Sequence, residues 1–459
     1  MNRPMLFERF LAAAAGAAGM LFVMGTTAWS EEPEAVSLVA DAPGAHSAVP
    51  AADEKKDAAD KDEKECQCQT LTEDWFGAGE KMAESGLSLR LSATQVWQDV
   101  ARGGLATHRH AGRYSGTYDL EIELDLEKAA RVPGGSLYIL AEGGWSDGID
   151  PPSVGSLFGV NANAFGDRSI QVSEFRYEQS LMDDRVLIRV GKLDLTGGFE
   201  CKGCAVAFDG NAFANDETAQ FLNGALVNNP TIPFSEPGIG AVVMAKLTDS
   251  WYVAAGMGDS RARAGTTGFG TAFDGGNHFL YIYETGYVAE PASCNGPLPG
   301  AYRIGLWHEP PSKPRFDGGS KHNDVGFYVS MDQMLYREKG GSDGDDEGPQ
   351  GLGAFTRFGF ADADTNPVKF FWSGGCQYRG LVPGRNADVL GVGVAQGRLT
   401  ADRDAGFTAS HETVAEVYYN IEVVPGLNVS PHVQFVANPG GLREVSDAVI
   451  VGFRVQAAF

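Results

Sequence analysis

The chain of 459 residues has no second long apolar run after its N-terminus. Beyond residue 30, no stretch approaches the ~18 consecutive apolar residues that a membrane-spanning helix needs, and the mean hydropathy is -0.17. Positive charge is scarce, with 36 Lys and Arg against 60 Asp and Glu and a net charge of -24. These features exclude a helical membrane bundle. They also disfavour nucleic acid as a partner, because no basic patch offsets the acidity.

Catalytic and metal-binding motifs are missing as well. The sequence contains no HExxH, Walker or dinucleotide-binding motif. Cys201 and Cys204 form a CxxC pair, but neither a second such pair nor a nearby His pair accompanies it. In an exported protein, a loop disulfide is the better interpretation of this pair. We therefore expect no enzymatic activity, no metal site and no cofactor.

The first thirty residues have the pattern of an export signal. Arg3 and Arg9 precede or begin an apolar run over residues 10–24, and small residues surround Trp29. This pattern predicts a cleavable secretory signal peptide over residues 1–30. If the exported protein sits in a membrane, it must do so as a closed barrel, because only helices and closed barrels satisfy their backbone groups in lipid.

Residues 31–70 form an acidic segment. Residues 31–65 hold eleven Asp and Glu against four Lys and no aromatic residue. Such a composition cannot bury enough apolar surface to order itself, so we expect a disordered periplasmic segment. A partner-binding role for this segment is the alternative.

From residue 87 onward, apolar and polar residues alternate with period two between turn signals. Leu120, Ile122, Leu124 and Leu126, for example, alternate with acidic residues. Alternation of this kind is typical of half-buried strands. Gly is frequent, at 60 residues, as in architectures with many turns. Sixteen strands are predicted, near residues 87–96, 114–126, 136–146, 169–180, 184–193, 239–247, 250–257, 278–288, 300–308, 323–332, 353–361, 368–378, 388–397, 413–423, 427–436 and 447–459.

A soluble sandwich would also alternate, but three features favour a transmembrane barrel. The strand count is even, as antiparallel outer-membrane barrels require. Tight turns, such as those at residues 181–183, 248–249 and 424–426, are each followed or preceded by a longer connection. The chain also ends on Phe459, on the apolar face of its last strand, which resembles the assembly signal of bacterial outer-membrane barrels. We therefore predict an all-β fold over residues 71–459: a sixteen-stranded transmembrane antiparallel β-barrel, preceded by a short helix near residues 71–84 that Thr72 can cap.

Several segments resemble the carbohydrate-selective porins of the OprB family. The most specific is ETVAEVYYNIEVVPGLNVSPHVQFVANPGG at residues 412–441, where a Pro-Gly turn joins two strands. The late strands are similar at GLGAFTRFGF (351–360) and GLVPGRNADVLGVGVAQG (380–397), and an early hairpin at RYEQSLMDDRVLIRVGKLD (176–194). The resemblance implies a sixteen-stranded pore for passive sugar uptake across the Gram-negative outer membrane. Trimers are common among related pores, so a homotrimer is left open.

In a barrel this wide, the polar side of each strand faces a water-filled lumen. Mixed arginine and carboxylate groups on that side offer donors and acceptors to a polyhydroxyl solute, while Trp307 offers an aromatic face for stacking. Bracing of the wall is the alternative role for each residue. The predicted pore-lining, sugar-contacting set is Arg90, Glu121, Glu123, Glu142, Glu174, Arg176, Glu178, Arg189, Arg303, Trp307 and Arg357.

The 45-residue connection 194–238 is the longest between two predicted strands. Long connections in compact proteins are usually functional or disordered. We expect it to fold into the barrel and narrow the pore, with an outward cap as the alternative. Two functions other than a sugar-selective porin stay open: a general, cation-leaning diffusion porin, and a structural outer-membrane barrel whose acidic tail binds cell-wall or periplasmic partners.

Overall fold

The structure is a computed structural model that describes residues 70–105, 112–196, 199, 214, 216–274, 276, 278–339 and 349–459. The predicted signal peptide, nearly all of the acidic segment and the CxxC pair lie outside the described residues. Of the cysteines that are described, Cys294 and Cys376 are free. Within the described ranges, no helix has both the length and the apolar character to cross a membrane.

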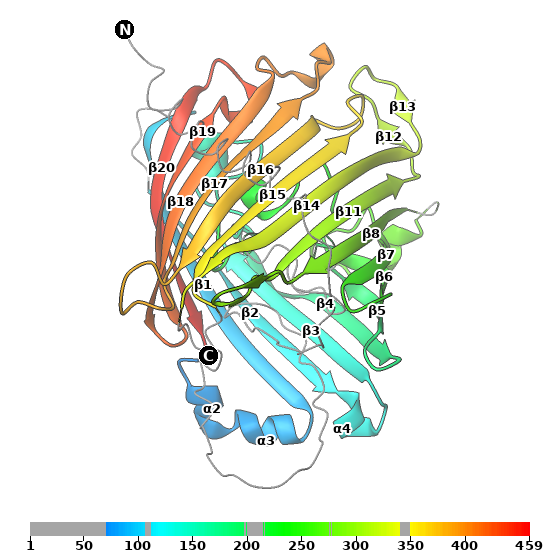
Figure 1. The fold of residues 1–459 in the computed structure, drawn as a ribbon. Coiled ribbons are helices and arrows are strands. Elements are labelled where there is room, and N and C mark those ends of the chain that lie inside the picture. Colours follow the sequence, from blue (N-terminus) through cyan, green and yellow to red (C-terminus); the bar gives the residue numbers. More distant parts are fainter. Residues whose placement is uncertain are drawn as a thin grey trace.

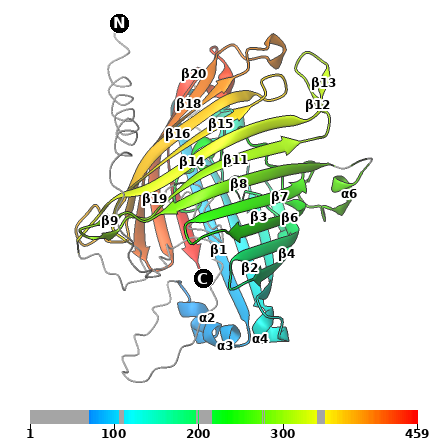
Figure 2. The same ribbon diagram turned by 45° about the vertical axis from the view of Figure 1, so that its right-hand side comes forward.

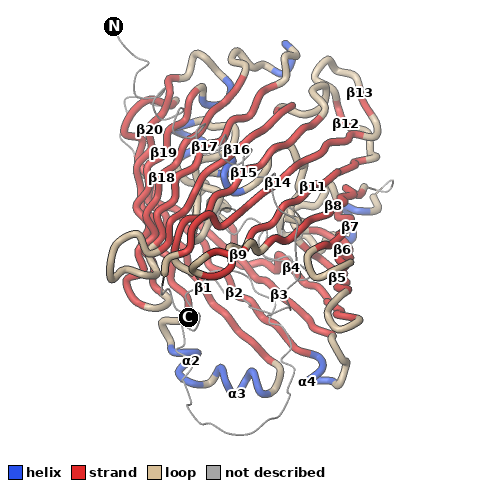
Figure 3. The backbone as a smooth tube through the Cα atoms, viewed as in Figure 1, coloured by secondary structure: helices blue, strands red, loops and turns tan. Residues whose placement is uncertain are grey.

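The described residues form a closed barrel of sixteen strands in chain order. Every neighbouring pair is antiparallel, and the barrel closes where Ala93 of the first strand pairs with Ala457 of the last. Strands dominate the structure (Figure 3), as the alternation of apolar and polar residues predicted. The barrel strands are β1 (Leu87–Gly104), β2 (Arg113–Asp125), β3 (Gly135–Trp145), β4 (Arg168–Leu181), β5 (Val186–Leu193), β6 (Gly238–Lys246), β7 (Trp251–Asp259), β8 (Phe279–Ala289), β11 (Gly300–Glu309), β14 (Asp324–Arg337), β15 (Gly351–Ala361), β16 (Val368–Arg379), β17 (Val389–Leu399), β18 (His411–Val424), β19 (Leu427–Ala437) and β20 (Ser446–Ala458).

All sixteen predicted strands are present, and the predicted fold is confirmed. Two short hairpins lie outside the barrel wall, one formed by β9 (Ala292–Ser293) and β10 (Gly296–Pro297), the other by β12 (Lys313–Pro314) and β13 (Ser320–Lys321). The short helical elements are α2 (Glu73–Gly77), α3 (Gly79–Glu84), α4 (Leu126–Ala130), the π-turn η1 (Asp150–Val154), α5 (Gly224–Val227), α6 (Phe269–Ala272), and the 3₁₀ turns η2 (Arg403–Ala405) and η3 (Pro439–Gly441).

The two ends of the barrel differ. Helices α2, α3 and α4 lie at one end with the C-terminus, and the β12–β13 hairpin lies at the other (Figures 1 and 2). We name the first the turn end, because the connections β4–β5, β6–β7 and β18–β19 there are tight, and the second the loop end. Outer-membrane barrels place short turns in the periplasm and long loops outside the cell.

The N-terminal helical segment is fixed at the turn end. Thr72 accepts a hydrogen bond from the Trp75 N–H at 3.2 Å, as its predicted capping role requires, and the Trp75 indole donates to the Leu89 carbonyl at 2.9 Å. Just before this segment, the chain passes close to the β18–β19 turn. A Cβ on Gly426 (φ 80°) would lie 2.7 Å from the Leu71 nitrogen, so the turn needs glycine there.

The outer face of the barrel is apolar and aromatic. Phe360 stacks on Phe327 with ring centroids 4.5 Å apart, and Phe370 packs on Phe360 at 4.7 Å. Trp251 and Tyr287 pair at 5.8 Å nearer the turn end. Aromatic residues of this kind form girdles at the interfaces of membrane barrels, so the outer face fits a lipid environment.

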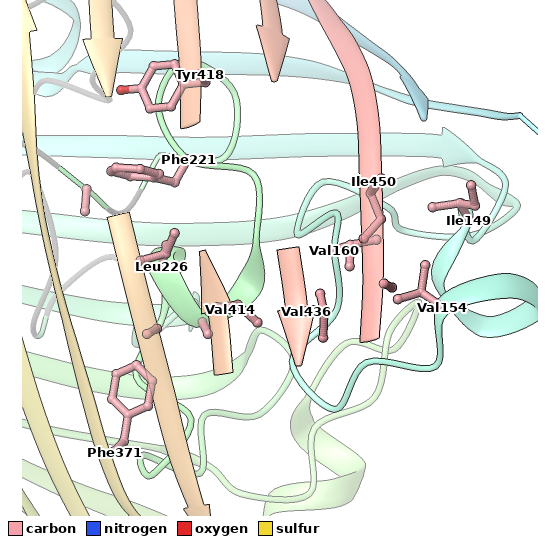
Figure 4. Close-up of a cluster of buried hydrophobic side chains, with 14 of the residues drawn as sticks. Ile149, Val154, Val160, Phe221, Leu226, Phe371, Val414, Tyr418, Val436 and Ile450 are labelled. Atoms are coloured by element: carbon pink, nitrogen blue, oxygen red, sulfur yellow. The ribbon is translucent and has the colours of Figure 1, made fainter. Parts of the chain in front are cut away.

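The interior of the barrel holds two apolar clusters that occupy part of the lumen. One packs Phe221 and Leu226, from the connection between β5 and β6, against wall residues that include Phe371, Val414 and Tyr418 (Figure 4). The other packs the beginning and end of the same connection against β5–β14. Part of the lumen is therefore filled by polypeptide, which decides where a passage can run.

Candidate functional site

The strand register places all eleven predicted pore-lining residues on the inner face of the barrel. Across β1–β5, Arg90 pairs with Glu121, Glu123 with Tyr138, Tyr138 with Arg176, and Glu178 with Arg189. This inner face of β1–β5 is hereafter the open wall. The predicted set supplies five glutamates and three arginines to it, and the structure adds Asp119, which pairs with Glu142.

Arg176 is the centre of an ionic cluster on the open wall. Its guanidinium lies 2.7 Å from a Glu174 oxygen and 2.6 Å from a Glu178 oxygen. Arg189 binds the same Glu178 oxygen at 3.2 Å. The guanidinium also lies over the Tyr138 ring, 3.7 Å from its centroid, in a cation–π contact. Two carboxylates and one aromatic ring therefore fix the orientation of the Arg176 guanidinium.

The other predicted groups on the open wall are more accessible. The Arg90 side chain is 40% exposed and lies 3.8 Å from Glu121, while Asp119 accepts a hydrogen bond from the Ser92 hydroxyl at 3.1 Å. Glu123 and Glu142 are also only partly covered. Six carboxylates thus share the open wall with three guanidinium groups, which makes its charge net negative.

Three members of the predicted set lie on the inner face but are covered by protein. Arg303 is fully buried against Asp332, with 2.9 Å between them. Trp307 has no exposed surface and packs in the second apolar cluster. Arg357, also without exposed surface, donates to the carbonyls of Leu226 and Val227 at 3.0 Å each. Period-two alternation gives the face of a residue but cannot show that another segment lies on top of it.

Described residues of the connection between β5 and β6, residues 194–237, cover Trp307 and Arg357. Leu195, Phe199 and Ile232 pack with Trp307 and its neighbours in the second cluster. Residues 216–231 then cross the inner faces of β15–β20, where Arg454 donates to the carbonyls of Glu217 and Gln220 at 2.8 and 3.0 Å. The expected inward course of this connection is present in its described residues.

A second connection, residues 146–167 between β3 and β4, also folds inward, which the sequence analysis did not predict. Ile149, Val154 and Val160 are completely buried in the first apolar cluster. The Val160 carbonyl accepts hydrogen bonds from the side-chain amides of Gln98 and Gln434 at 2.9 and 2.8 Å. The segment has no regular period, so its position depends on contacts with distant parts of the chain.

Among the described residues, the two inward connections leave most charges of the open wall partly exposed, while Glu178 and Arg189 are buried. A selective diffusion pore must admit its solute and exclude others by width and polarity. A closed barrel whose lumen is narrowed from one side meets this requirement. The fold, the apolar outer face and the polar inner wall together define an outer-membrane diffusion porin.

Comparison with known proteins agrees with this class. The model of the family described as "Carbohydrate-selective porin, OprB family" matches residues 109–459. Porin B of Pseudomonas aeruginosa is 21% identical over 424 residues, covering 84% of this chain and 90% of that protein. The high-pH structure of Pseudomonas putida OprB superposes with a TM-score of 0.72 at 20% identity, covering 86% of this chain and 99% of the other.

The chain therefore belongs to the carbohydrate-selective porin, OprB family, and is a channel of the Gram-negative outer membrane. A more partial similarity is to Porin AaxA of Chlamydia muridarum, 22% identical over 62% of this chain and 55% of that protein. The turn end is accordingly periplasmic and the loop end extracellular. The family resemblance seen in residues 176–194 and 351–441 is confirmed.

Proposed function

We propose that small neutral sugars cross the membrane passively along the open wall. The observation that carries this proposal is the fixed alternation of Arg90 and Arg176 with carboxylates on the open wall, where most of the charged side chains are partly exposed. Charge-assisted hydrogen bonds of this kind are strong and oriented. A sugar hydroxyl can therefore exchange water for protein partners at little net change in free energy.

Transport through such a wall needs many weak contacts and no tight site, since a tightly bound solute would not leave. The Arg176 cluster meets this need because its groups already satisfy one another. Arg90, with its larger exposure, is the most accessible donor. No covalent step is needed, so we propose passage without catalysis and without a cofactor or metal.

The remaining parts of the chain have proposed roles of a simpler kind. Residues 1–30 direct export and are removed, residues 31–70 form a periplasmic segment available to cell-wall or periplasmic partners, and residues 71–459 form the pore. The segment joins the barrel at the turn end, where the Leu71 N–H donates to the Ala458 carbonyl at 2.9 Å. A homotrimer, as in related pores, is the proposed assembly.

A general, cation-leaning diffusion porin is the second candidate, favoured by the six carboxylates against three arginines on the open wall. Liposome swelling with solutes of graded size and charge separates the two. A sugar-selective pore admits small neutral sugars faster than size-matched amino acids, whereas a general pore sorts by size and charge alone. Absence of swelling with every solute would overturn both.

A further inference from the structure

Two glutamates on one strand each contact one of the two inward connections. Glu412 and Glu416 lie four residues apart on β18 and share the inner face, because the register pairs them with Gly397 and Gly393 of β17. Their side chains are almost completely buried, at 0% and 1% exposure. Neither residue can touch a solute in the passage, so their role must be exerted through other groups.

Glu416 holds the longer connection. Its two carboxylate oxygens accept hydrogen bonds from the backbone N–H groups of Leu222, at 2.9 Å, and Asn223, at 2.8 Å. These N–H groups stand at the start of α5, where Asn223 also accepts from the Ala225 N–H. A carboxylate with both oxygens used in this way fixes the backbone in position and direction.

Glu412 holds the shorter connection in a similar way. One oxygen accepts from the Ser156 hydroxyl at 2.6 Å, and the other accepts from the N–H groups of Leu157, at 2.9 Å, and Gly440, at 2.6 Å. Gly440 belongs to the loop-end connection between β19 and β20. Glu412 therefore ties the inward segment to the rim of the barrel as well as to its wall.

The two connections are also joined to each other. The Ala162 N–H donates to the Leu222 carbonyl at 2.8 Å, and the Gly224 N–H donates to the Gly159 carbonyl at 3.1 Å. Leu222 is thus held by Glu416 through its N–H and by the other connection through its carbonyl. A shift of either connection would have to break bonds in both.

Glycines beneath the connections leave room for this close packing. A Cβ on Gly393 would lie 2.9 Å from the Phe221 ring, and one on Gly397 would lie 2.5 Å from the Phe158 ring. Both glycines sit directly opposite the two glutamates in the register. Carboxylates on β18 and bare backbone on β17 together form a seat for two segments from distant parts of the chain.

We propose that Glu412 and Glu416 are positioning residues that seat both inward connections and thereby set the width of the sugar passage. This inference rests on the proposed function. It adds which residues limit the size of the solutes that can pass. The arginine and carboxylate groups of the open wall face the solute from one side. The seated connections form the opposite side, and their distance from the open wall depends on β18.

The first test compares the ion conductance of single channels in planar bilayers. Glu416→Gln keeps the side-chain shape but replaces one acceptor oxygen with a donor that faces a backbone N–H. We expect conductance to rise by roughly twofold or more as the connection leaves its seat, because barrels of this size are wide enough for an aqueous channel. Glu416→Asp, which keeps the carboxylate, should fall between Gln and the native channel.

A double-mutant cycle shows whether Glu416 acts through the connection. Replacing residues 216–230 with a short Gly-Ser linker should raise conductance by itself. Adding Glu416→Gln to that variant should then change nothing further, since two groups acting through one contact are not additive. Glu80→Gln, on the exposed helix α3, removes the same charge away from the passage and should match the native channel.

Gly393→Leu provides a test that leaves the carboxylates intact. The added side chain would displace Phe221 and Leu226, so we expect the same rise in conductance. Heat-modifiable mobility on gels reports in each case that the barrel has folded. Native conductance for folded Glu416→Gln and Gly393→Leu, or full additivity in the cycle, would overturn the proposal.

This test is independent of the sugar assay. If Glu416→Gln widens a channel through which no sugar passes selectively, the positioning role stands and the proposed function fails. If sugars pass selectively and Glu416→Gln leaves both conductance and the size limit unchanged, the proposed function stands and the positioning role fails.

Discussion

Arg176 illustrates how a single side chain on the open wall is oriented. Glu174 and Glu178 each bind its guanidinium, which also stacks on the Tyr138 ring. A lysine could not reproduce this arrangement, because only the planar guanidinium can bind two carboxylates and stack on a ring at the same time.

We predict that Arg176→Ala weakens block of the channel by sugars. Loss of the guanidinium removes donors and leaves Glu174 and Glu178 facing each other without the cation between them. Hydrogen bonds to charged groups contribute about 1.5–3 kcal/mol, so we expect the block constant to weaken by roughly ten- to a hundredfold. Sugar-induced current noise in single channels measures it. Arg185→Ala, an exposed arginine at the turn end, is the control, and equal block in both variants would contradict the prediction.

Trp307 has a structural role that its position in the sequence did not reveal. Its ring is completely buried, 5.4 Å from the Lys313 ammonium. We predict that Trp307→Ala lowers the free energy of unfolding by about 3–5 kcal/mol, the usual loss for a buried tryptophan. Heat-modifiable mobility against temperature measures this change.

Trp307→Leu separates packing from stacking on sugar. Leucine keeps much of the buried volume but has no aromatic face, so it should recover part of the lost stability and leave sugar block at the native value. A loss of sugar block in Trp307→Leu at near-native stability would show instead that the ring contacts the solute.

At the scale of elements, the strands could be predicted from the sequence and the inward connections only in part. Strand parity follows from a period of two, which Leu120 to Leu126 display plainly, and an apolar outer face facing lipid enforces that period in every strand. The connections 146–167 and 194–237 have no period of their own. Their course depends on wall residues far away in the chain, such as Glu412 and Gln434, whose buried contacts no local pattern encodes.

Asp150 gives the shorter connection a dependence on pH. Burial raises the pKa of this carboxyl to about 6, against the opposing hydrogen bond from the Ser156 N–H at 3.0 Å. A raised pKa means that the folded connection binds the proton more tightly than the unfolded one. The stability linked to this proton is therefore fully present below the unfolded value near 4 and is lost as the pH rises through about 6.

We accordingly predict that residues 146–167 are held more firmly at pH 5 than at pH 7.5. Spin labels on this connection, read by electron paramagnetic resonance, should show greater mobility at the higher pH. Asp150→Asn cannot titrate at this position and should reduce the difference. A native protein with the same label mobility at both pH values, or a variant that keeps the full difference, would contradict the prediction.

At the scale of the whole molecule, the charge of the passage matters more than the charge of the chain. The chain carries -24, and eleven of its acidic residues belong to segment 31–65, which precedes the barrel strands in the sequence. Fixed charges act over about 10 Å at 0.1 M salt and about 3 Å at 1 M. Ion selectivity should therefore follow the six carboxylates and three arginines of the open wall.

We predict a modest preference for cations, seen as a reversal potential of the corresponding sign in a KCl gradient and shrinking as salt is raised. Glu121→Gln with Glu123→Gln removes two of the six negative charges and should move the reversal potential toward zero.

The same double variant should speed the passage of anionic sugars relative to neutral sugars of equal size, because the field that repels them is weaker. Glu80→Gln with Glu127→Gln, two acidic residues at the turn end on α3 and α4, lowers the chain's charge equally without touching the open wall. If that pair shifts the reversal potential as far as the open-wall pair does, selectivity follows total charge and the open wall is not where solutes and ions pass.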